Sequence, residues 1–428
     1  MYGLLMCLFF IGICLLGFPI SVSALAASIF YLVVNGGNIS LAIVTQTMCS
    51  GINQYSMLAI PLFILAGNIM NFGGVTERIF KFCSAMVGHI PGGLGQVNVL
   101  GSIIFAGMSG SGTADAAGLG KVEIEAMKKE GYDVGFSAAV TAASACIGPI
   151  IPPSIPAVVY AVQAGVSTGA MFAAGVIPGL IMGMSQMVLC YFLGKKYGYY
   201  QKKATFATVK KTFWSALPAL FAPVLIIGGS FSGFFTPTEA ASVTVGYGAA
   251  IGLFLYRELK LTDLKHILWD TVENTAMIML IMGTVTTLGW ILTRELIPQT
   301  ICAWIVSLSD SPTVVMLLML VFLLIVGCFI TPSAAILIVV PIIKPLVADL
   351  NIPPLQFAML VVYTLCVGNV TPPVGNVLYI TARVANITLE RLIKCMIPWY
   401  IPLVLLAVAI VFFPNLSTWL PVYLQFAK

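Results

Sequence analysis

A duplication that repeats its helix breakers in register constrains this chain more than any other feature. Residues 107–178 align with residues 327–398 without a gap, at a constant offset of 220. The matched pairs include Gly107 with Gly327, Cys146 with Cys366, Gly148 with Gly368, Pro152 with Pro372 and Pro153 with Pro373. In a mostly apolar chain, paired segments interrupted by Gly and Pro are typical of the binding sites of membrane transporters.

The composition indicates the environment of the chain. Of its 428 residues, 60% are hydrophobic and 8% are charged, and no Asp, Glu, Lys or Arg occurs from Tyr2 to Thr76. Apolar runs long enough to cross the ~30 Å hydrocarbon core recur along the chain, whereas the short alternating segments of a β-barrel do not. We therefore predict an all-α polytopic membrane protein.

The first apolar stretch, which runs to Val34, has two interpretations: a secretory signal or a membrane span. Ala24, Leu25 and Ala26 resemble a cleavage site, but no basic residue precedes the apolar stretch. A signal peptide normally carries a basic segment at that place. We predict one retained span with a cytoplasmic N-terminus.

The basic residues predict the orientation of the other spans. Six lysines lie in one polar stretch, and no acidic residue occurs between Asp133 and Glu239; the lysines are Lys195, Lys196, Lys202, Lys203, Lys210 and Lys211. Because cytoplasmic loops carry an excess of Lys and Arg, this stretch should face the cytoplasm. Counting the membrane crossings from this stretch gives the two copies opposite orientations in the membrane and places the C-terminus in the periplasm. By this count, Asp310 lies on the periplasmic side. The only basic residues on that side are Arg294, Lys344 and Lys428.

Each copy contains a hairpin too short to cross twice and a span broken at mid-depth. The first hairpin runs 94–107, has its tip at 108–115 and returns to Lys121; the second runs 314–330, has its tip at 331–333 and returns to Lys344. The breaks lie at 148–154 and 368–373. Pro-Pro after Gly ends one half-helix and begins another, because proline lacks the amide hydrogen and clashes with the preceding turn.

The tips and breaks predict an ion and substrate site. Freed carbonyls and hydroxyls suit a small hard cation, and the N-termini of half-helices suit a carboxylate. The hydroxyls are Ser109, Ser111 and Thr113 in one copy and Thr331, Ser333 and Thr371 in the other. The alternative is that these small residues only permit close helix packing. Four clusters in two matched pairs favour the site.

Asp115 is the most informative single side chain, because a carboxylate at mid-membrane costs ~2.5 to 3.5 kcal/mol on insertion scales. Two roles remain open for it: organising the tip by capping the return helix, or binding ion and substrate directly. Other acids have plainer interpretations. We predict that Glu123 and Glu125 belong to a solvated hairpin base and that Glu239 starts a helix after Thr236.

The sequence gives little support to other classes of protein, such as metalloproteins, ATP-driven pumps, enzymes and channels. The ten cysteines are isolated, and His89 lies far from His266, which predicts neither disulfides nor a transition-metal site. An ATP-driven pump lacks its GxxxxGK[ST] loop. An enzyme would need a nucleophile with a base or a metal set, and none is evident beside Asp115. An ion channel remains a more distant alternative, although paired sites of opposite orientation suit alternating access better.

Several strings resemble the large membrane subunit of a tripartite ATP-independent periplasmic (TRAP) transporter, over nearly the whole chain and most closely the sialic acid type. They are FGGVTERI (72–79), PGGLGQVNVLGSIIFAGMSGSGTADAAGLGKVEIEAMKKEGYD (91–133), GPIIPPSIPAVVYA (148–161), GFFTPTEAASV (233–243) and GNVTPPVGNVLY (368–379). A permease for C4-dicarboxylates or another organic acid is the close alternative.

The resemblance implies a sodium-driven elevator of the ion transporter superfamily, built on an inverted repeat with two re-entrant hairpins and two broken helices. It needs no cofactor other than the coupling ion. The implied organisation is scaffold and arm helices at 1–90, transport-domain repeat 1 at 91–165, scaffold helices at 166–310, transport-domain repeat 2 at 311–385, and a C-terminal scaffold helix at 386–428.

Carried over residue by residue, the resemblance places one sodium site at Ser109, Ser111, Gly148 and Pro152 and another at Thr331, Ser333, Gly368 and Thr371. The substrate would lie between them, near Ser111, Gly112, Thr113, Asp115, Ser154, Asn369 and Pro372. Neither tip carries the Arg that would bind a carboxylate. Hydroxyls, backbone amides and bound sodium would have to hold it.

The resemblance also implies partners and a location. The partners are a small four-helix membrane subunit (Q type) and a periplasmic substrate-binding protein (P type), and the chain should start directly at the large subunit's first span. No nucleic-acid partner is expected, and the location is the bacterial inner membrane. Arg294 and Glu295 have two interpretations: an anchor at the lipid headgroups, or part of the rim that receives the binding protein.

Overall fold

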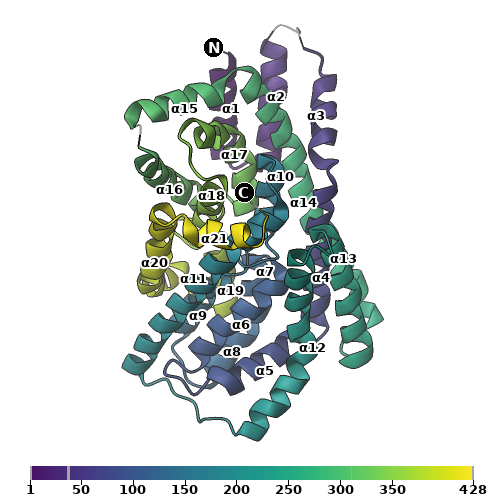
Figure 1. Cartoon of the computed structure of the whole chain (residues 1–428), viewed down its shortest axis with the longest axis vertical. Helices are drawn as coiled ribbons and strands as arrows, with labels where there is room; N and C mark the ends of the chain where they lie inside the picture. The colour runs from purple at the N-terminus through teal and green to yellow at the C-terminus, as the bar shows by residue number, and fades with distance from the viewer. Residues whose placement is uncertain (1, 36–38, 310, 427–428) are drawn as a thin grey trace.

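The computed structural model describes residues 2–35, 39–309 and 311–426, and every regular element in these ranges is helical (Figure 1). Seven of the helices are long and apolar enough to cross a membrane, among them α11 (Thr168–Tyr197), α14 (Leu261–Arg294) and α20 (Leu389–Phe412). The prediction of an all-α membrane protein is confirmed. Asp310 and Lys428, which the topology assigns to the outer side, lie outside the described residues.

The remaining helices lie wholly or mostly outside the duplicated segments. They are α1 (Tyr2–Leu15), α2 (Ile20–Val34), α3 (Ala42–Ile52), η1 (Tyr55–Leu58), α4 (Ala59–Phe72), α5 (Val75–Val87), α12 (Phe206–Phe231), α13 (Pro237–Ala250), η2 (Ile251–Leu255), α15 (Ile297–Leu308) and α21 (Asn415–Tyr423), together with α11, α14 and α20. The long helix α14 packs against α2, α3 and α4. Hydrogen bonds from Thr47 to Thr287 and from Asn68 to Thr271 join these helices.

Helix ends in the two copies fall where Gly and Pro predict them. The first copy contains α6 (Leu94–Ser109), α7 (Gly112–Ala117), α8 (Leu119–Lys129), α9 (Val134–Ala145) and α10 (Ile155–Ala164). The second contains α16 (Pro312–Phe329), α17 (Pro332–Asp349), α18 (Pro354–Gly368) and α19 (Asn376–Ala385). Both predicted tips and both predicted breaks therefore separate helices in the structure.

The N-terminal segment differs from the prediction. It is not one span but two helices, α1 and α2, which pack side by side and are separated by a turn at Gly17, whose φ is +87°. Proline at position 19 precedes α2 and prevents one continuous helix. The backbone amide of Gly3 and the hydroxyl of Tyr31 both donate hydrogen bonds to Glu295 at the end of α14.

The N-terminus consequently lies at the same end of the molecule as Arg294. A cytoplasmic N-terminus and a periplasmic Arg294 cannot both hold, so the predicted combination was wrong. The error came from counting the stretch to Val34 as one crossing, since the turn at Gly17 returns the chain to the side from which it began.

The predicted role of Glu239 is confirmed. Thr236 caps α13 and accepts a hydrogen bond from the amide of Glu239, while the Glu239 carboxylate accepts one from the amide of Thr236 at 2.8 Å. This reciprocal pair satisfies two amide groups that the first turn of a helix leaves free.

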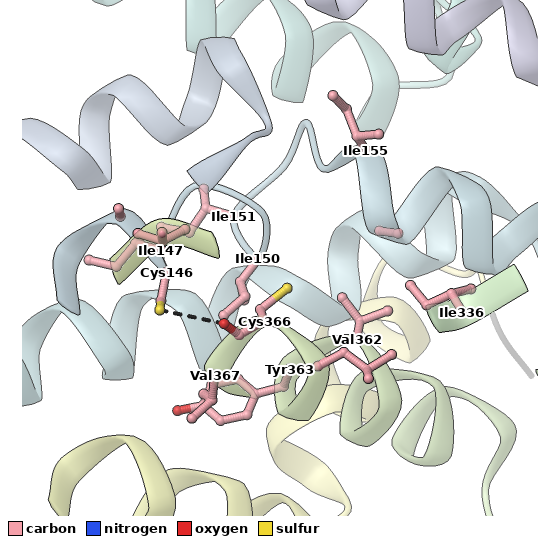
Figure 2. Close-up of a cluster of buried hydrophobic side chains, with 14 of the residues drawn as sticks. Cys146, Ile147, Ile150, Ile151, Ile155, Ile336, Val362, Tyr363, Cys366 and Val367 are labelled. Carbon is pink, nitrogen blue, oxygen red and sulfur yellow. Dashed lines mark hydrogen bonds between the residues drawn. The ribbon is translucent and has the colours of Figure 1, made fainter. Parts of the chain in front are cut away.

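The helices that lead into the two breaks meet in the core of the molecule. The thiol of Cys146 lies 3.6 Å from the carbonyl oxygen of Cys366, its counterpart in the duplication. Figure 2 shows the buried apolar side chains around this contact, including Ile147, Ile150 and Val367. Helix α19 of the second copy also packs against α7, α8 and α9 of the first. The duplicated segments thus form one continuous packed body.

Polar contacts join the same body at one end. The ammonium of Lys128 on α8 donates a hydrogen bond to the carbonyl of Ala385 at the end of α19. Asp133 caps α9 and forms a 2.7 Å ion pair with Arg391 on α20. These contacts hold the base of the first hairpin against the end of the second broken helix.

Candidate functional site

The tips of both hairpins face one cavity of about 540 Å³. Ser109 to Ala114 contribute from the first tip, Thr331 to Ser333 from the second, and Ile155 and Pro156 from the start of α10. Pro149 and Asn369 add one residue from each break, and helices α4 and α14 form the opposite wall. The cavity is therefore bounded by the duplicated body on one side and by the surrounding helices on the other.

The first tip is docked on the first break. Ser111 caps α7 by accepting a hydrogen bond from the amide of Ala114, and its hydroxyl lies 2.9 Å from that of Thr113. The carbonyl of Gly110 accepts a hydrogen bond from the amide of Ile155. Gly110 has a φ of +62°, and a Cβ at this position would lie 2.6 Å from the carbonyl oxygen of Pro153. Only glycine fits this close approach.

The second break is held by the second hairpin in a different way. The amide of Gly375 donates to the carbonyl of Cys328, and a Cβ on Gly368 would lie 2.6 Å from the Cα of Gly327. Two glycine backbones are thus in direct contact where α16 and α18 cross. In the first copy the matched residue Gly107 contacts Pro223 of α12 instead, so the paired glycines serve different contacts.

Two buried oxygen atoms at the cavity have no hydrogen-bond partner among the described residues. They are the hydroxyl of Ser109 and the side-chain oxygen of Asn369, one from each copy. A buried polar oxygen without a protein partner costs free energy, so these two atoms are candidates to bind an ion, a solute or a water molecule. Ser109 was predicted as a sodium ligand and Asn369 as a substrate ligand, and both roles stay predictions.

The cavity gathers part of the predicted site. Its lining includes Ser109, Ser111, Gly112, Thr113, Thr331, Ser333 and Asn369. The remaining predicted residues are not part of the lining: Gly148, Pro152, Ser154, Gly368, Thr371, Pro372 and Asp115. Some of them support the lining directly. Ser154 caps α10 and donates to the carbonyl of Pro149, and a Cβ on Gly148 would lie 3.3 Å from the backbone of Ser111.

Asp115 is buried beneath the first tip and does not reach the cavity. Its side chain is 2% exposed, and neither carboxyl oxygen has a hydrogen bond of good geometry in the described structure, although Ser102 lies beside it. The capping role that was one alternative for Asp115 belongs to Ser111.

Glu123 corrects the prediction of a solvated hairpin base. It is 1% exposed, and a Cβ on Gly101 of α6 would lie 2.9 Å from its carboxyl oxygen. Glu125, two residues later, is exposed as predicted. Because α8 turns one face toward α6 and α9, neighbouring acids on it occupy opposite environments.

Sequence reasoning missed the polar side chains on the opposite wall. Asn68 and Asn71 on α4 and Asp270 and Asn274 on α14 line the cavity. They lie inside helices that continue without interruption, even past Gly67 in α4, so no helix break marked them. A weak signal was available: the spacings of three and four residues place each pair on one helix face.

The electrostatics of the cavity favour an anion at the tips. Helices α10 and α17 both begin at the lining, and the N-terminus of a helix carries positive partial charge. No Lys, Arg or His is among the described residues of the lining. A carboxylate there would be held by amides, hydroxyls and a bound cation.

Arg294 and Glu295 occupy different environments at the end of α14. Arg294 is exposed and stacks over the ring of Trp290. Glu295 is half-buried and accepts the hydrogen bonds from Gly3 and Tyr31 described above. Of the two, Arg294 is the better placed to contact a partner protein.

Comparison with known proteins identifies the family. The family of the DctM component of tripartite ATP-independent periplasmic transporters matches residues 6–416. The chain belongs to this family. Its members are transporters and not enzymes, and TRAP large permeases work with a small membrane subunit and a periplasmic binding protein.

Relatives within the TRAP family carry different substrate names. The sialic acid TRAP transporter large permease protein SiaM of Vibrio cholerae is 40% identical over 417 residues, which is 96% of each chain. The C4-dicarboxylate TRAP transporter large permease protein DctM of Pseudomonas aeruginosa is 37% identical over 87% of each chain. The 2,3-diketo-L-gulonate permease protein YiaN of Escherichia coli is 36% identical over 96% of this chain and 97% of the relative.

Proposed function

We propose that this TRAP permease takes up a small carboxylate, of which sialic acid is the first candidate, together with sodium. A periplasmic binding protein of the P type delivers the solute, and a small Q-type subunit completes the membrane part. The duplicated body carries the cargo by an elevator motion against the surrounding helices. The chain lies in the bacterial inner membrane with its Lys195–Lys211 stretch in the cytoplasm.

One observation carries this proposal: a single cavity brings together the two tips, the starts of α10 and α17 and two unpartnered buried oxygens. Sodium is a hard cation that prefers such oxygen atoms, and the helix starts attract the carboxylate. Sodium bound at the tips would also supply the positive charge that the lining lacks. The two cargoes would then stabilise each other, which is the basis of symport.

The sodium assignment predicts the effect of Ser109→Ala. The Ser109 hydroxyl has no protein partner, so its loss removes a cation ligand without breaking a described hydrogen bond. Loss of one such group typically costs about 1 to 3 kcal/mol. The sodium concentration for half-maximal uptake in proteoliposomes should rise roughly five- to hundredfold.

Ser185→Ala is the matched control. The Ser185 hydroxyl bonds only to the carbonyl of Met182 on its own helix, α11, away from the cavity. An unchanged sodium dependence in the Ser109 variant, equal to that of the control, would refute sodium binding at the first tip. Uptake that fails to saturate with the solute would instead favour the channel alternative.

The partner surface predicts the effect of Arg294→Glu. An exposed charge at the rim of an interface mainly steers encounter and register. Reversing it should raise the binding-protein concentration for half-maximal uptake roughly tenfold at low salt, with a smaller effect at high salt, where such charges are screened.

Lys210→Glu makes the same change of charge on the exposed lysine stretch, which we assign to the other side of the membrane. It should leave the dependence on binding protein unchanged. If both variants behave like the wild type at limiting binding protein, Arg294 only anchors α14 at the headgroups.

A further inference from the structure

The wall that α4 and α14 present to the cavity has its own chemistry. Besides apolar residues such as Ile64 and Ile278, it contributes three asparagines and one aspartate. Asp270 is the only ionisable side chain among the described lining residues. The cavity is thus polarised: helix starts on one side and a carboxylate on the other.

The asparagines on this wall retain hydrogen-bonding capacity. Asn68 donates to Thr271 at 3.2 Å, Asn71 accepts from Thr76 at 3.0 Å, and Asn274 donates to the carbonyl of Asp270 at 2.7 Å. Each described bond uses one end of an amide that has both a donor and an acceptor end. The other ends are available to a solute with several polar groups.

The Asp270 carboxylate has no Lys or Arg partner among the described ion pairs. It lies 3.6 Å from Nδ1 of His266, whose side chain is 74% exposed. The carboxylate itself is partly exposed, at 39%. As a lining residue it can accept hydrogen bonds from a solute, and it repels a second negative charge placed beside it.

We propose that Asp270 determines the class of substrate, an inference that rests on the function proposed above. It favours monocarboxylates that carry hydroxyl or amino groups at the far end, as sugar acids do, and it disfavours dicarboxylates. Such a solute places its carboxylate at the helix starts of the duplicated body and its donors against Asp270 and the asparagines. A dicarboxylate instead carries a second negative charge, which Asp270 repels from across the cavity.

Binding to the purified permease complex tests this proposal without the selection that the binding protein imposes. N-acetylneuraminate and succinate serve as probes, and each dissociation constant is measured at saturating sodium. The wild type should bind N-acetylneuraminate more tightly than succinate. Asp270→Asn removes the charge and keeps the shape, so the preference should fall at least about fivefold, mainly through tighter succinate binding.

Glu273→Gln is the matched control, because Glu273 is exposed on the same helix and does not line the cavity. It should retain the wild-type preference. A wild type that prefers succinate, or an Asp270→Asn variant with an unchanged ratio, would overturn the role of Asp270 while leaving carboxylate uptake in place. Failure of both acids to bind at any sodium concentration would overturn the proposed function and this inference together.

Discussion

Replacing Gly368 with alanine is expected to abolish sodium-driven uptake. The added Cβ would lie 2.6 Å from the Cα and 2.7 Å from the carbonyl carbon of Gly327, and neither atom belongs to a flexible side chain that can turn away. The backbones of α16 and α18 would have to separate. Overpacking of this kind costs about 1 to 3 kcal/mol, and the displacement occurs beside Asn369 at the cavity. Thermal unfolding of the purified variant and uptake in proteoliposomes measure the two effects.

Gly246→Ala is the control for this change. Gly246 lies in α13, and nothing lies within 4 Å of the position that its Cβ would take. The control should be as active as the wild type and at least as stable, because alanine is the better helix former. A Gly368→Ala variant with wild-type uptake and melting temperature would show that the contact between the two glycines is not tight.

A tag placed ahead of Tyr2 is expected to be accessible only from the periplasm. The α1–α2 turn and the contacts of Glu295 with Gly3 and Tyr31 place the N-terminus at the far end of α14 from Lys260 and Lys265. Since basic loops stay in the cytoplasm, the N-terminus should be outside. The measurement is antibody labelling of intact spheroplasts and of permeabilised cells. The tag should be labelled fully in the intact spheroplasts, with no further labelling after permeabilisation.

A second tag inserted between Lys203 and Lys210 is the internal reference, because it should be labelled only after permeabilisation. If the two tags exchange behaviour, the whole orientation inferred from the lysines is reversed. If both tags are labelled on the same side, the packing of α1 against the end of α14 is wrong.

The sequence predicted the parts of the site that depend on local backbone chemistry. Clusters of Gly and Pro such as Gly110 and Pro152-Pro153 interrupt helices, so the first tip and the first break could be located without knowing what packs around them, whereas single prolines such as Pro178 lie inside a continuous helix. The same local rule predicted the helix start at Thr236. In each case a short local combination of residues favours the backbone conformation that is observed.

The rest of the site depends on which helix faces lie together, and that information is not local. Glu123 is flanked by Lys121 and Glu125, which suggested a solvated segment, yet α6 covers it. Asp270 lies in a helix that continues for several turns on both sides, and only the position of the tips makes it part of a cavity. Gly17 and Pro19 were a local signal for the α1–α2 turn, but the length of the apolar run favoured the prediction of a single span.

The contact between Cys146 and Cys366 has a consequence for the fidelity of coupling. It joins the helices that lead into the two breaks through a buried apolar cluster, and close-packed interiors transmit strain. In the proposed cycle, neither half can cross the membrane while the other stays behind. Slippage, in which a sodium ion enters without its solute, would require the packing of that cluster to be disrupted. A substitution that weakens the packing of this cluster should therefore raise the number of sodium ions that enter per solute molecule before it lowers the rate of solute uptake.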